Sequence, residues 1–379
     1  MVKRILAGLC LVALALGCVG CGSDAGQPTT ASVSSSTTQP QTPKGNVRYV
    51  NPDPSLQAAW EQIGRDFTAA TGHSVQILTP EQAKNITPTL FTVTDEQDLA
   101  LWADVCVDLA GERATHHFLN WDLALYDGDK MCGLPLEAQG YGLIYNDELL
   151  RKAGVTAADI NSFAKLREVV NNIAANTSLK VKPFACFDAD SEAAALLAAM
   201  PGDLRPFWDL YINNAAKASS EEDDCFTQIA EGDAVFCIGS TWEFEILANM
   251  SEGNLNIMPL YIGMEGETQQ GLCVRVENYL CVRSDIAPLD RDATLAFLDY
   301  LTHPEDDKVP IDTLGVFTPY STANYCASPM ERTFRDHIAG KRLVVFSNLS
   351  APEGFCTALL TYAVTPTDEN WAAVTATLG

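Results

Sequence analysis

The side chains that could carry chemistry in this 379-residue chain are mainly carboxylates and thiols, since it contains 49 acidic residues and 12 cysteines but five histidines. The patterns GxSxG, HExxH, GxxxxGK[ST] and GxGxxG, which would position a nucleophile, a zinc ion or a nucleotide phosphate, are absent. His116 and His117 are adjacent, so on a helix they would point about 100° apart and could not share one metal ion. We therefore expect no metal, no cofactor and no enzymatic activity. A carboxylate pair suited to glycoside hydrolysis is the alternative that the composition leaves open.

Polar and aromatic residues follow several short β-rich runs in the sequence. Asn51 and Asp53 follow the run 46–50, Asp95 follows a second such run, and Trp242 follows a third. Side chains that follow parallel strands meet at one edge of an open α/β sheet. Carboxylates and amides can hydrogen-bond hydroxyl groups there, while an aromatic ring covers an apolar face.

The elements that would hold these side chains alternate between strand and helix. An amphipathic helix is predicted over 56–70, where Trp60, Ile63 and Phe67 recur at helical spacing and assign Trp60 to the core. With the strand before it and the run 75–78 after it, this helix makes a β-α-β unit. Strand and helix patterns then continue in two series, which predicts an α/β fold with two sheets.

Composition and charge limit the class of protein. The chain is 47% hydrophobic and 8% aromatic, as in globular proteins, and it is long enough for two lobes. Its formal net charge is −25. A nucleic-acid partner is therefore not expected, because neutralising phosphates needs clustered Lys and Arg. The acidity argues equally against a partner that is held by the charge of anionic lipids.

The N-terminus has the pattern of an export signal. Residues 1–17 combine a basic start, an apolar stretch and small residues, and the stretch is shorter than the roughly 20 residues of a transmembrane helix. The sequence Leu14–Cys18 resembles the lipobox of bacterial lipoproteins, which implies a lipid on Cys18, with Cys21 as the alternative. A flexible Ser/Thr/Pro-rich linker is predicted over 18–45. The protein would then be lipid-anchored on the extracellular or periplasmic side of the cell membrane.

The cysteines of an exported protein can form disulfides. Close spacing suggests the pairs Cys273–Cys281 and Cys225–Cys237, and Cys106–Cys132 is a further candidate. The body after the linker contains an odd number of cysteines, so they cannot all pair with one another. Buried free thiols are the alternative.

Six segments follow one another in an order typical of one family. They are VRYVNPDPSLQAAWEQIGRDFTAATGHSVQI, GLPLEAQGYGLIYNDELL, EGDAVFCIGSTWEFEIL, MPLYIGMEGETQQGLCVRVENYLCV, LDYLTHPEDD and LGVFTPYSTANY. With the lipobox in front, they resemble the extracellular solute-binding proteins of ABC transporters, in the sugar-binding class that includes maltose-binding protein. The chain departs from that pattern in its many cysteines, in one extra residue before Trp242 and in the stretch Phe346–Phe355.

The resemblance implies a periplasmic-binding-protein-like fold, with two α/β lobes joined by a hinge of three crossing segments. The crossings are expected near Glu137–Gln139, Gly271–Val274 and Thr318–Tyr320. Lobe 1 would consist of 46–137 plus 273–319, and lobe 2 of 138–272 plus 320–379. Ligand would bind between the lobes, which close around it.

Candidate ligand-binding residues come from the loops and crossings that match the family. They are Asn51, Asp53, Asp95, Trp102, Glu137, Tyr141, Asp188, Asp190, Trp242, Glu277, Asn278 and Phe355. Trp242, in the Gly-Ser-Thr-Trp loop, is the foremost aromatic candidate.

The function that this resemblance implies is capture of a carbohydrate and its delivery to an ABC permease in the membrane. The protein would act as a monomer, without a cofactor. Other small solutes, such as a polyamine or a peptide, are alternatives, and an acidic chain could supply the carboxylates that a polyamine needs. A secreted glycoside hydrolase and an adhesin-like lipoprotein are the remaining alternatives.

Overall fold

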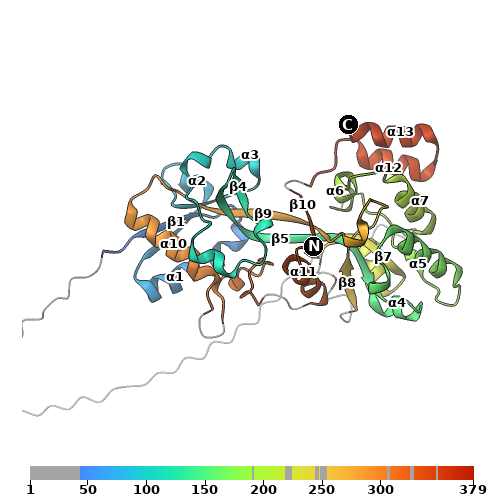
Figure 1. Cartoon of the computed structure of the whole chain (residues 1–379), viewed down its shortest axis with the longest axis horizontal. Helices are drawn as coiled ribbons and strands as arrows, with labels where there is room; N and C mark the ends of the chain where they lie inside the picture. Colours follow the sequence, from blue (N-terminus) through green and yellow to red (C-terminus); the bar gives the residue numbers. More distant parts are fainter. Residues whose placement is uncertain are drawn as a thin grey trace, which may run out of the picture. The chain divides into compact units, whose positions relative to one another are not determined.

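The strands assemble into one mixed sheet with helices packed around it (Figure 1). The structure is a computed structural model, and it describes residues 43–189, 192–217, 224–243, 247, 254–304, 308–324, 328–346 and 349–379. The predicted signal peptide, most of the linker, Cys18, Cys21 and Asp190 lie outside the described residues. Among the residues described, none of the helices combines the length and apolarity needed to cross a bilayer.

The described elements have the following bounds. The strands are β1 (Asn46–Val50), β2 (Ser74–Leu78), β3 (Leu90–Val93), β4 (Leu125–Asp127), β5 (Lys130–Asn146), β6 (Lys182–Phe184), β7 (Ala234–Ser240), β8 (Leu255–Met258), β9 (Leu272–Val282) and β10 (Leu343–Phe346). The helices are α1 (Gln57–Thr71), α2 (Pro80–Ala83), α3 (Glu96–Leu99), α4 (Asp147–Lys152), α5 (Phe163–Ala175), α6 (Glu192–Ala199), α7 (Arg205–Asn214), α8 (Cys225–Glu231), α10 (Pro288–Thr302), α11 (Pro329–Ala339), α12 (Phe355–Val364) and α13 (Asp368–Thr377).

The order of strands in the sheet is β2-β1-β3-β9-β5-β7-β6, with β10 beside β9 and with β4 and β8 beside β5. Strand β1 pairs in parallel with β2 and β3, β6 with β7, and β10 with β9. The pairs β3–β9, β5–β9 and β5–β7 are antiparallel. The predicted α/β class is therefore confirmed, as a mixed sheet.

The expectation of two separate sheets is wrong. Strand β5 has 17 residues and β9 has 11, and both run through the middle of the sheet. The two β-rich runs predicted at Gly133–Leu136 and Gly142–Tyr145 are one strand, because the residues between them continue to pair with β9. Figure 1 shows β5 and β9 side by side.

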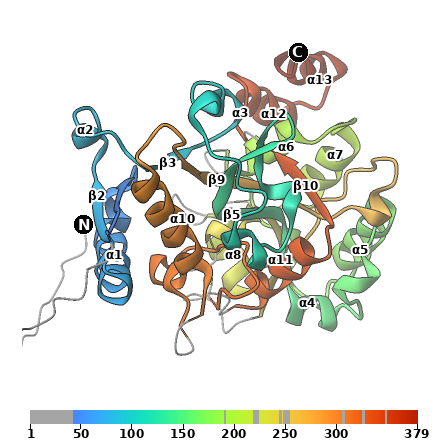
Figure 2. The same cartoon turned by 60° about the vertical axis from the view of Figure 1, so that its left-hand side comes forward.

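Apolar side chains form two cores along this sheet. The first core includes Tyr49, Trp60, Phe67 and Phe297, and the second includes Phe184, Phe207, Trp208, Tyr211 and Phe236. Trp60 is fully buried, which confirms its assignment to the core. Strand β5 contributes residues to both cores. The division of the chain into two lobes at the predicted boundaries stays a prediction. Helices α12 and α13 pack against each other beside the second core (Figure 2).

Helix α1 confirms the helix predicted over 56–70. Trp60 and Phe67 are buried on one face, as their spacing predicts. The helix ends at Gly72, whose φ of 76° favours glycine and whose N–H donates to Thr68 O at 2.8 Å. Leu56 belongs to the short 3₁₀ turn that precedes the helix.

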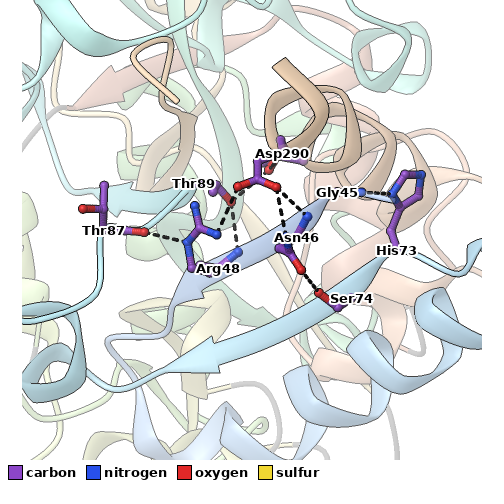
Figure 3. Close-up of polar contacts among 9 residues, drawn as sticks. Gly45, Asn46, Arg48, His73, Ser74, Thr87, Thr89 and Asp290 are labelled. Atoms are coloured by element: carbon purple, nitrogen blue, oxygen red, sulfur yellow. Dashed lines mark hydrogen bonds and ion pairs between the residues drawn. The ribbon is translucent and has the colours of Figure 1, made fainter. Parts of the chain in front are cut away.

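The start of β1 is held by a polar network centred on Asp290, in the first turn of α10 (Figure 3). Asp290 Oδ1 accepts hydrogen bonds from Asn46 N at 2.8 Å and Asn46 Nδ2 at 3.2 Å. Its second oxygen, Oδ2, lies 3.1 Å from Arg48 Nη1. Arg48 in turn donates through Nε to Thr87 O at 2.8 Å. These contacts tie the first strand to a helix that comes far later in the chain.

Among the described residues, no two cysteines are joined by a disulfide. The predicted Cys273–Cys281 pair is wrong, because both lie on β9 and eight extended residues span about 26 Å. The thiols of Cys225 and Cys237 are in hydrogen-bond contact instead of bonded covalently. Cys106 contacts both Cys132 and Cys281.

Candidate functional site

The pairing of β5 with β9 is irregular where the candidate site lies. Glu137 lies opposite Asn278, and the register shifts on either side of Glu137. Such irregularities twist a strand and redirect its side chains, and they are common beside binding sites. Gln139 lies opposite Arg275 after the shift. The two strands thereby bring several polar side chains to one place near the middle of the sheet.

A cavity of about 280 Å³ opens at this irregularity. It is lined by Glu137, Gln139, Glu192, Trp242, Glu277 and Asn278. The lining comes from β5, β9, the start of α6 and the turn after β7. Residues far apart in sequence thus form one polar cavity, to which the described residues contribute one aromatic ring, Trp242.

Trp242 is presented to the cavity by a short 3₁₀ turn, Thr241–Glu243, directly after β7. Glu243 is buried and accepts from Ser240 N at 2.8 Å and from Ser240 Oγ at 2.5 Å. Ser240 Oγ also accepts from Trp242 N at 3.2 Å. The Trp242 side chain remains 63% exposed, so its ring is available to a ligand. Thr241 fixes the turn to β5, because its Oγ1 accepts from Gly140 N at 3.0 Å.

Hydrogen bonds orient the polar lining. Tyr141 is buried, and its hydroxyl donates to Gln139 Oε1 at 2.9 Å. Arg275 forms an ion pair with Glu277 through Nη2 and Oε2. Among the described residues, the buried oxygens Oε2 of Glu192 and Oε1 of Glu277 have no hydrogen-bond partner. Both oxygens are acceptors that a ligand hydroxyl or ammonium group could satisfy.

Burial changes the acidity of this lining. Loss of solvent raises the pKa of Glu137 to about 7, aided by the charges of Glu277 and Asp53 and opposed by a hydrogen bond from Gln139 and by Arg275. Desolvation also raises the pKa of Glu277, although Arg275 counters it. Desolvation, then the nearby Glu192 and Glu277 charges, raises the pKa of the Tyr141 hydroxyl. The cavity therefore combines an acidic character with a carboxyl group that titrates near neutral pH.

Four of the predicted ligand residues line this cavity together: Glu137, Trp242, Glu277 and Asn278. Tyr141 is not part of this lining, but its hydroxyl donates a hydrogen bond to the lining residue Gln139. The loop of Asp53 is close enough for its charge to influence Glu137.

Four other predicted residues have local structural contacts. Asn51 is buried and its side-chain amide donates to Asp53 O at 2.7 Å. Asp53 and Asp95 accept hydrogen bonds from Ser55 N and Asp98 N, both at 2.8 Å, and so cap short helices. The ring of Trp102 lies against Phe91 and Arg283, outside the cavity lining. Their role in ligand binding stays a prediction.

Two further predicted residues, Phe355 and Asp188, lie outside the cavity lining. Phe355 is fully buried at the start of α12. Asp188 follows β6 and is not part of the cavity lining. Their part in ligand binding also stays a prediction.

Gln139, Glu192 and Arg275 were not among the predicted ligand residues. Gln139 lies two residues from Glu137 on β5, and Arg275 lies two residues from Glu277 on β9, so the two-residue periodicity of strands could have identified them. Glu192 opens the alanine-rich helix α6, whose sequence contains no signal for this location.

The three predicted crossings lie close to one another. Ala138 N donates to Phe317 O at 3.0 Å, and the Tyr320 hydroxyl donates to Pro135 O at 3.0 Å. The third crossing, Thr318–Tyr320, therefore runs beside the first. On β9, the residues opposite Glu137–Gln139 are Arg275–Asn278, which come just after the predicted Gly271–Val274.

Comparison with known proteins finds a family model and several solved structures that match this chain. A family model for bacterial extracellular solute-binding protein matches residues 68–329. No match was found among curated proteins. The apo form of RafE from Streptococcus pneumoniae is 16% identical, with a TM-score of 0.64, over 90% of this chain and 98% of its own.

Two further solved structures are similar. The sugar-binding protein MalE from Xanthomonas citri is 17% identical, with a TM-score of 0.65, over 88% of this chain and 95% of its own. The bacterial solute receptor AcbH is 12% identical, with a TM-score of 0.65, over 89% of this chain and 98% of its own. At these identities the likeness concerns the fold.

Proposed function

Because the chain belongs to the bacterial extracellular solute-binding proteins, we propose that it captures a carbohydrate in the cavity between β5, β9 and Trp242 and delivers it to an ABC permease. The observation that carries the proposal is the exposed Trp242 ring beside the polar side chains of Glu137, Gln139 and Asn278. A sugar ring has hydroxyl groups at its edge and apolar C–H groups on its faces.

Each part of a sugar finds a matching group in this cavity. The carboxylates of Glu137, Glu192 and Glu277 accept hydrogen bonds from hydroxyl groups, while the amides of Gln139 and Asn278 both donate and accept. A ring face can pack on Trp242. Structurally similar proteins support this ligand class: RafE is known in complex with raffinose, and AcbH prefers β-D-galactopyranose exclusively.

Transport without catalysis is the remaining part of the proposal. A lipid on Cys18, or on Cys21, would hold the protein at the membrane, with the linker 18–45 between lipid and body. Ligand contacts made only in a closed state would drive closure around the solute, and the permease would receive it. A monomer without a cofactor suffices for this cycle.

A cationic solute is the second candidate, because the cavity is acidic. Glu137, Glu192 and Glu277 contribute three carboxyl groups, and Arg275 pairs with one of them. A polyamine, or a peptide with a free amino group, would compensate the remaining charge. The same buried oxygens of Glu192 and Glu277 would then accept hydrogen bonds from ammonium groups.

Thermal unfolding of the body, residues 43–379, against a panel of mono- and oligosaccharides, polyamines and short peptides tests the proposal. A ligand at about 100 times its dissociation constant stabilises a protein by about 2.7 kcal/mol. This raises the unfolding midpoint by several degrees in a protein of this size. A shift with one sugar class, without turnover of that sugar, supports the proposal.

Trp242→Ala should weaken binding of the same sugar at least about tenfold, since stacking on the ring is lost. Trp121→Ala is the matched control, because Trp121 is also exposed, at 42%, but does not line the cavity. Shifts with polyamines alone would favour the cationic candidate. Release of shortened sugars would point to a glycoside hydrolase, and equal loss of affinity in both variants would argue against Trp242 as the stacking ring.

A further inference from the structure

Three buried cysteine thiols meet at the end of the first core, away from the ligand cavity. Cys106 follows the 3₁₀ turn Ala103–Val105, Cys132 lies on β5 and Cys281 lies on β9. Their exposed fractions are 2%, 0% and 0%. The Cys106 thiol is in hydrogen-bond contact with both Cys281 and Cys132. Cys106 is therefore the central member of the cluster.

The sheet itself brings these thiols together. Cys106 forms an isolated antiparallel bridge with Arg283, two residues beyond Cys281. On the other side, Leu134 pairs with Leu280, which places the start of β5 beside the end of β9. A Cβ atom added to Gly133 would lie 2.8 Å from Tyr279 Cβ and 3.4 Å from Cys281 Sγ, so this glycine allows β5 and β9 to pack closely beside the sulfur atom. The segment before Cys106 is also fixed, because Lys130 Nζ donates to Ala103 O at 2.9 Å.

The environment favours Cys106 as the reacting thiol. A hydrogen bond from Cys281 lowers the pKa of Cys106, and the charges of Lys130 and Arg283 act in the same direction against the effect of burial. A lower thiol pKa increases the thiolate fraction that attacks disulfides. Among the described residues, no group of three or more His, Cys, Asp or Glu side chains is arranged to hold a metal ion. A metal site therefore does not explain this cluster.

We propose that Cys106 and Cys281 form a disulfide in the mature extracellular protein, while Cys132 stays a thiol. The family is extracellular, where disulfides form and persist. The oxidant is a small-molecule or protein disulfide that gains the electron pair and becomes a dithiol or two thiols. Because the three thiols are buried in the folded protein, the exchange takes place late in folding, after β9 has brought Cys281 and Arg283 beside Cys106 and before the rest of the core covers the thiols.

The exchange proceeds in two balanced steps. The Cys106 thiolate attacks one sulfur of the oxidant's disulfide, which forms a mixed disulfide and releases one oxidant thiolate. Cys281 loses its proton to solvent and attacks Cys106 Sγ, which forms the protein disulfide and releases the second oxidant thiolate. The two protein thiols together lose two protons and two electrons.

The bond would link the loop after α3 to β9, the strand that carries Arg275, Glu277 and Asn278. Cys106 and Cys281 are far apart in sequence, so a cross-link between them restricts the unfolded chain strongly. Cys273, on the same strand, lies 3.6 Å from Met200 Sδ, and this contact involves no second thiol. Cys273 is therefore a natural control.

Peptide mapping of the full chain, after secretion or after refolding in a glutathione redox buffer, tests the proposal. The protein is denatured and alkylated without reduction, digested, and analysed by mass spectrometry. We expect a cross-linked peptide pair that contains Cys106 and Cys281, with Cys132 and Cys273 alkylated. Alkylation of both Cys106 and Cys281, or a bond between Cys106 and Cys132, would overturn the proposal.

Stability measurements give a second readout. Refolding with reductant should lower the unfolding midpoint of the wild type, Cys132→Ala and Cys273→Ala by several degrees relative to refolding in redox buffer. The decrease should be clearly smaller in Cys106→Ala. Cys225 and Cys237 are unchanged in all four proteins, so any bond between them contributes equally. An equal decrease in all four would contradict the Cys106–Cys281 bond.

Discussion

Burial of Glu137 makes the stability of the protein depend on pH above the range of an ordinary carboxyl group. Desolvation raises its pKa to about 7 in the folded state, against about 4.3 in the unfolded chain. The folded state therefore holds more protons between these two values. The contribution of Glu137 to the stability of the folded state is complete below about pH 4 and is lost as the pH rises through about 7.

We expect Glu137→Gln to remove this loss, because an amide keeps the shape of the side chain without the charge. Urea unfolding at pH 5, 6, 7 and 8 should show a flatter profile for the variant than for the wild type. Glu81→Gln, on the exposed short helix α2, is the control and should follow the wild type. Parallel profiles for all three proteins would show that Glu137 is not desolvated in the folded state.

Individual site residues differ in how far sequence predicts them. Trp242 follows a strong β-rich run and a Gly-Ser-Thr turn, so its location at a strand end follows from local pattern. Glu192 lacks such a signal, because its approach to the cavity depends on how α6 packs on the sheet. The ring of Phe355 is fully buried in the second core, and its part in ligand binding stays a prediction. Local sequence shows which groups could bind and does not show which of them tertiary packing leaves accessible.

The junction between β1 and α10 depends on one carboxylate. Desolvation alone would raise the pKa of Asp290, but hydrogen bonds from Asn46 and Arg48 outweigh it and hold the pKa below its usual value. A carboxyl group whose pKa is lower in the folded state stabilises the protein at pH values above its pKa in the unfolded chain. This stabilisation is lost as the pH falls through the pKa of the folded state. Hydrogen bonds to a charged group contribute about 1.5–3 kcal/mol each, and a polar replacement keeps part of this.

Asp290→Asn should therefore destabilise the body by about 1–2 kcal/mol at pH 7 and by much less near pH 3. Urea unfolding monitored by circular dichroism at both values measures the difference. Asp292→Asn, two residues along the same helix, provides the control, since Asp292 takes no part in the contacts of Asp290, Asn46 and Arg48 described above. A difference that is the same at both pH values would exclude a charge effect.

Elements with local signals were predicted best. Helix α1 has its apolar spacing and its terminal glycine within one short segment, and the prediction is confirmed. Strand β5 was divided into two, because glycines and polar residues from Glu137 to Tyr141 interrupt the apolar pattern. Pairing with β9 on one side and β7 on the other compensates for that weak local preference. The continuous sheet is thus a tertiary property.

The whole molecule is connected through β5 and β9. Leu134 of β5 belongs to the first core and Leu143 to the second. If one core unfolded while β5 and β9 stayed paired in the other core, buried backbone groups of these strands would become exposed. We therefore expect a single cooperative unfolding transition for residues 43–379, although a chain of this length often has separate domains.

Hydrogen exchange measured by mass spectrometry checks this expectation. Phe236→Ala, fully buried in the second core on β7, should destabilise that core by about 3–5 kcal/mol. If unfolding is cooperative, the protection of β1, in the first core, falls by the same free energy. Leu360→Ala, exposed at 42% on α12, is the control and should change protection by less than about 0.5 kcal/mol. Loss of protection in β7 while β1 is unchanged would show that the two cores unfold independently. The shared strands would then act as a flexible connection, which is also the property that closure around a ligand would require.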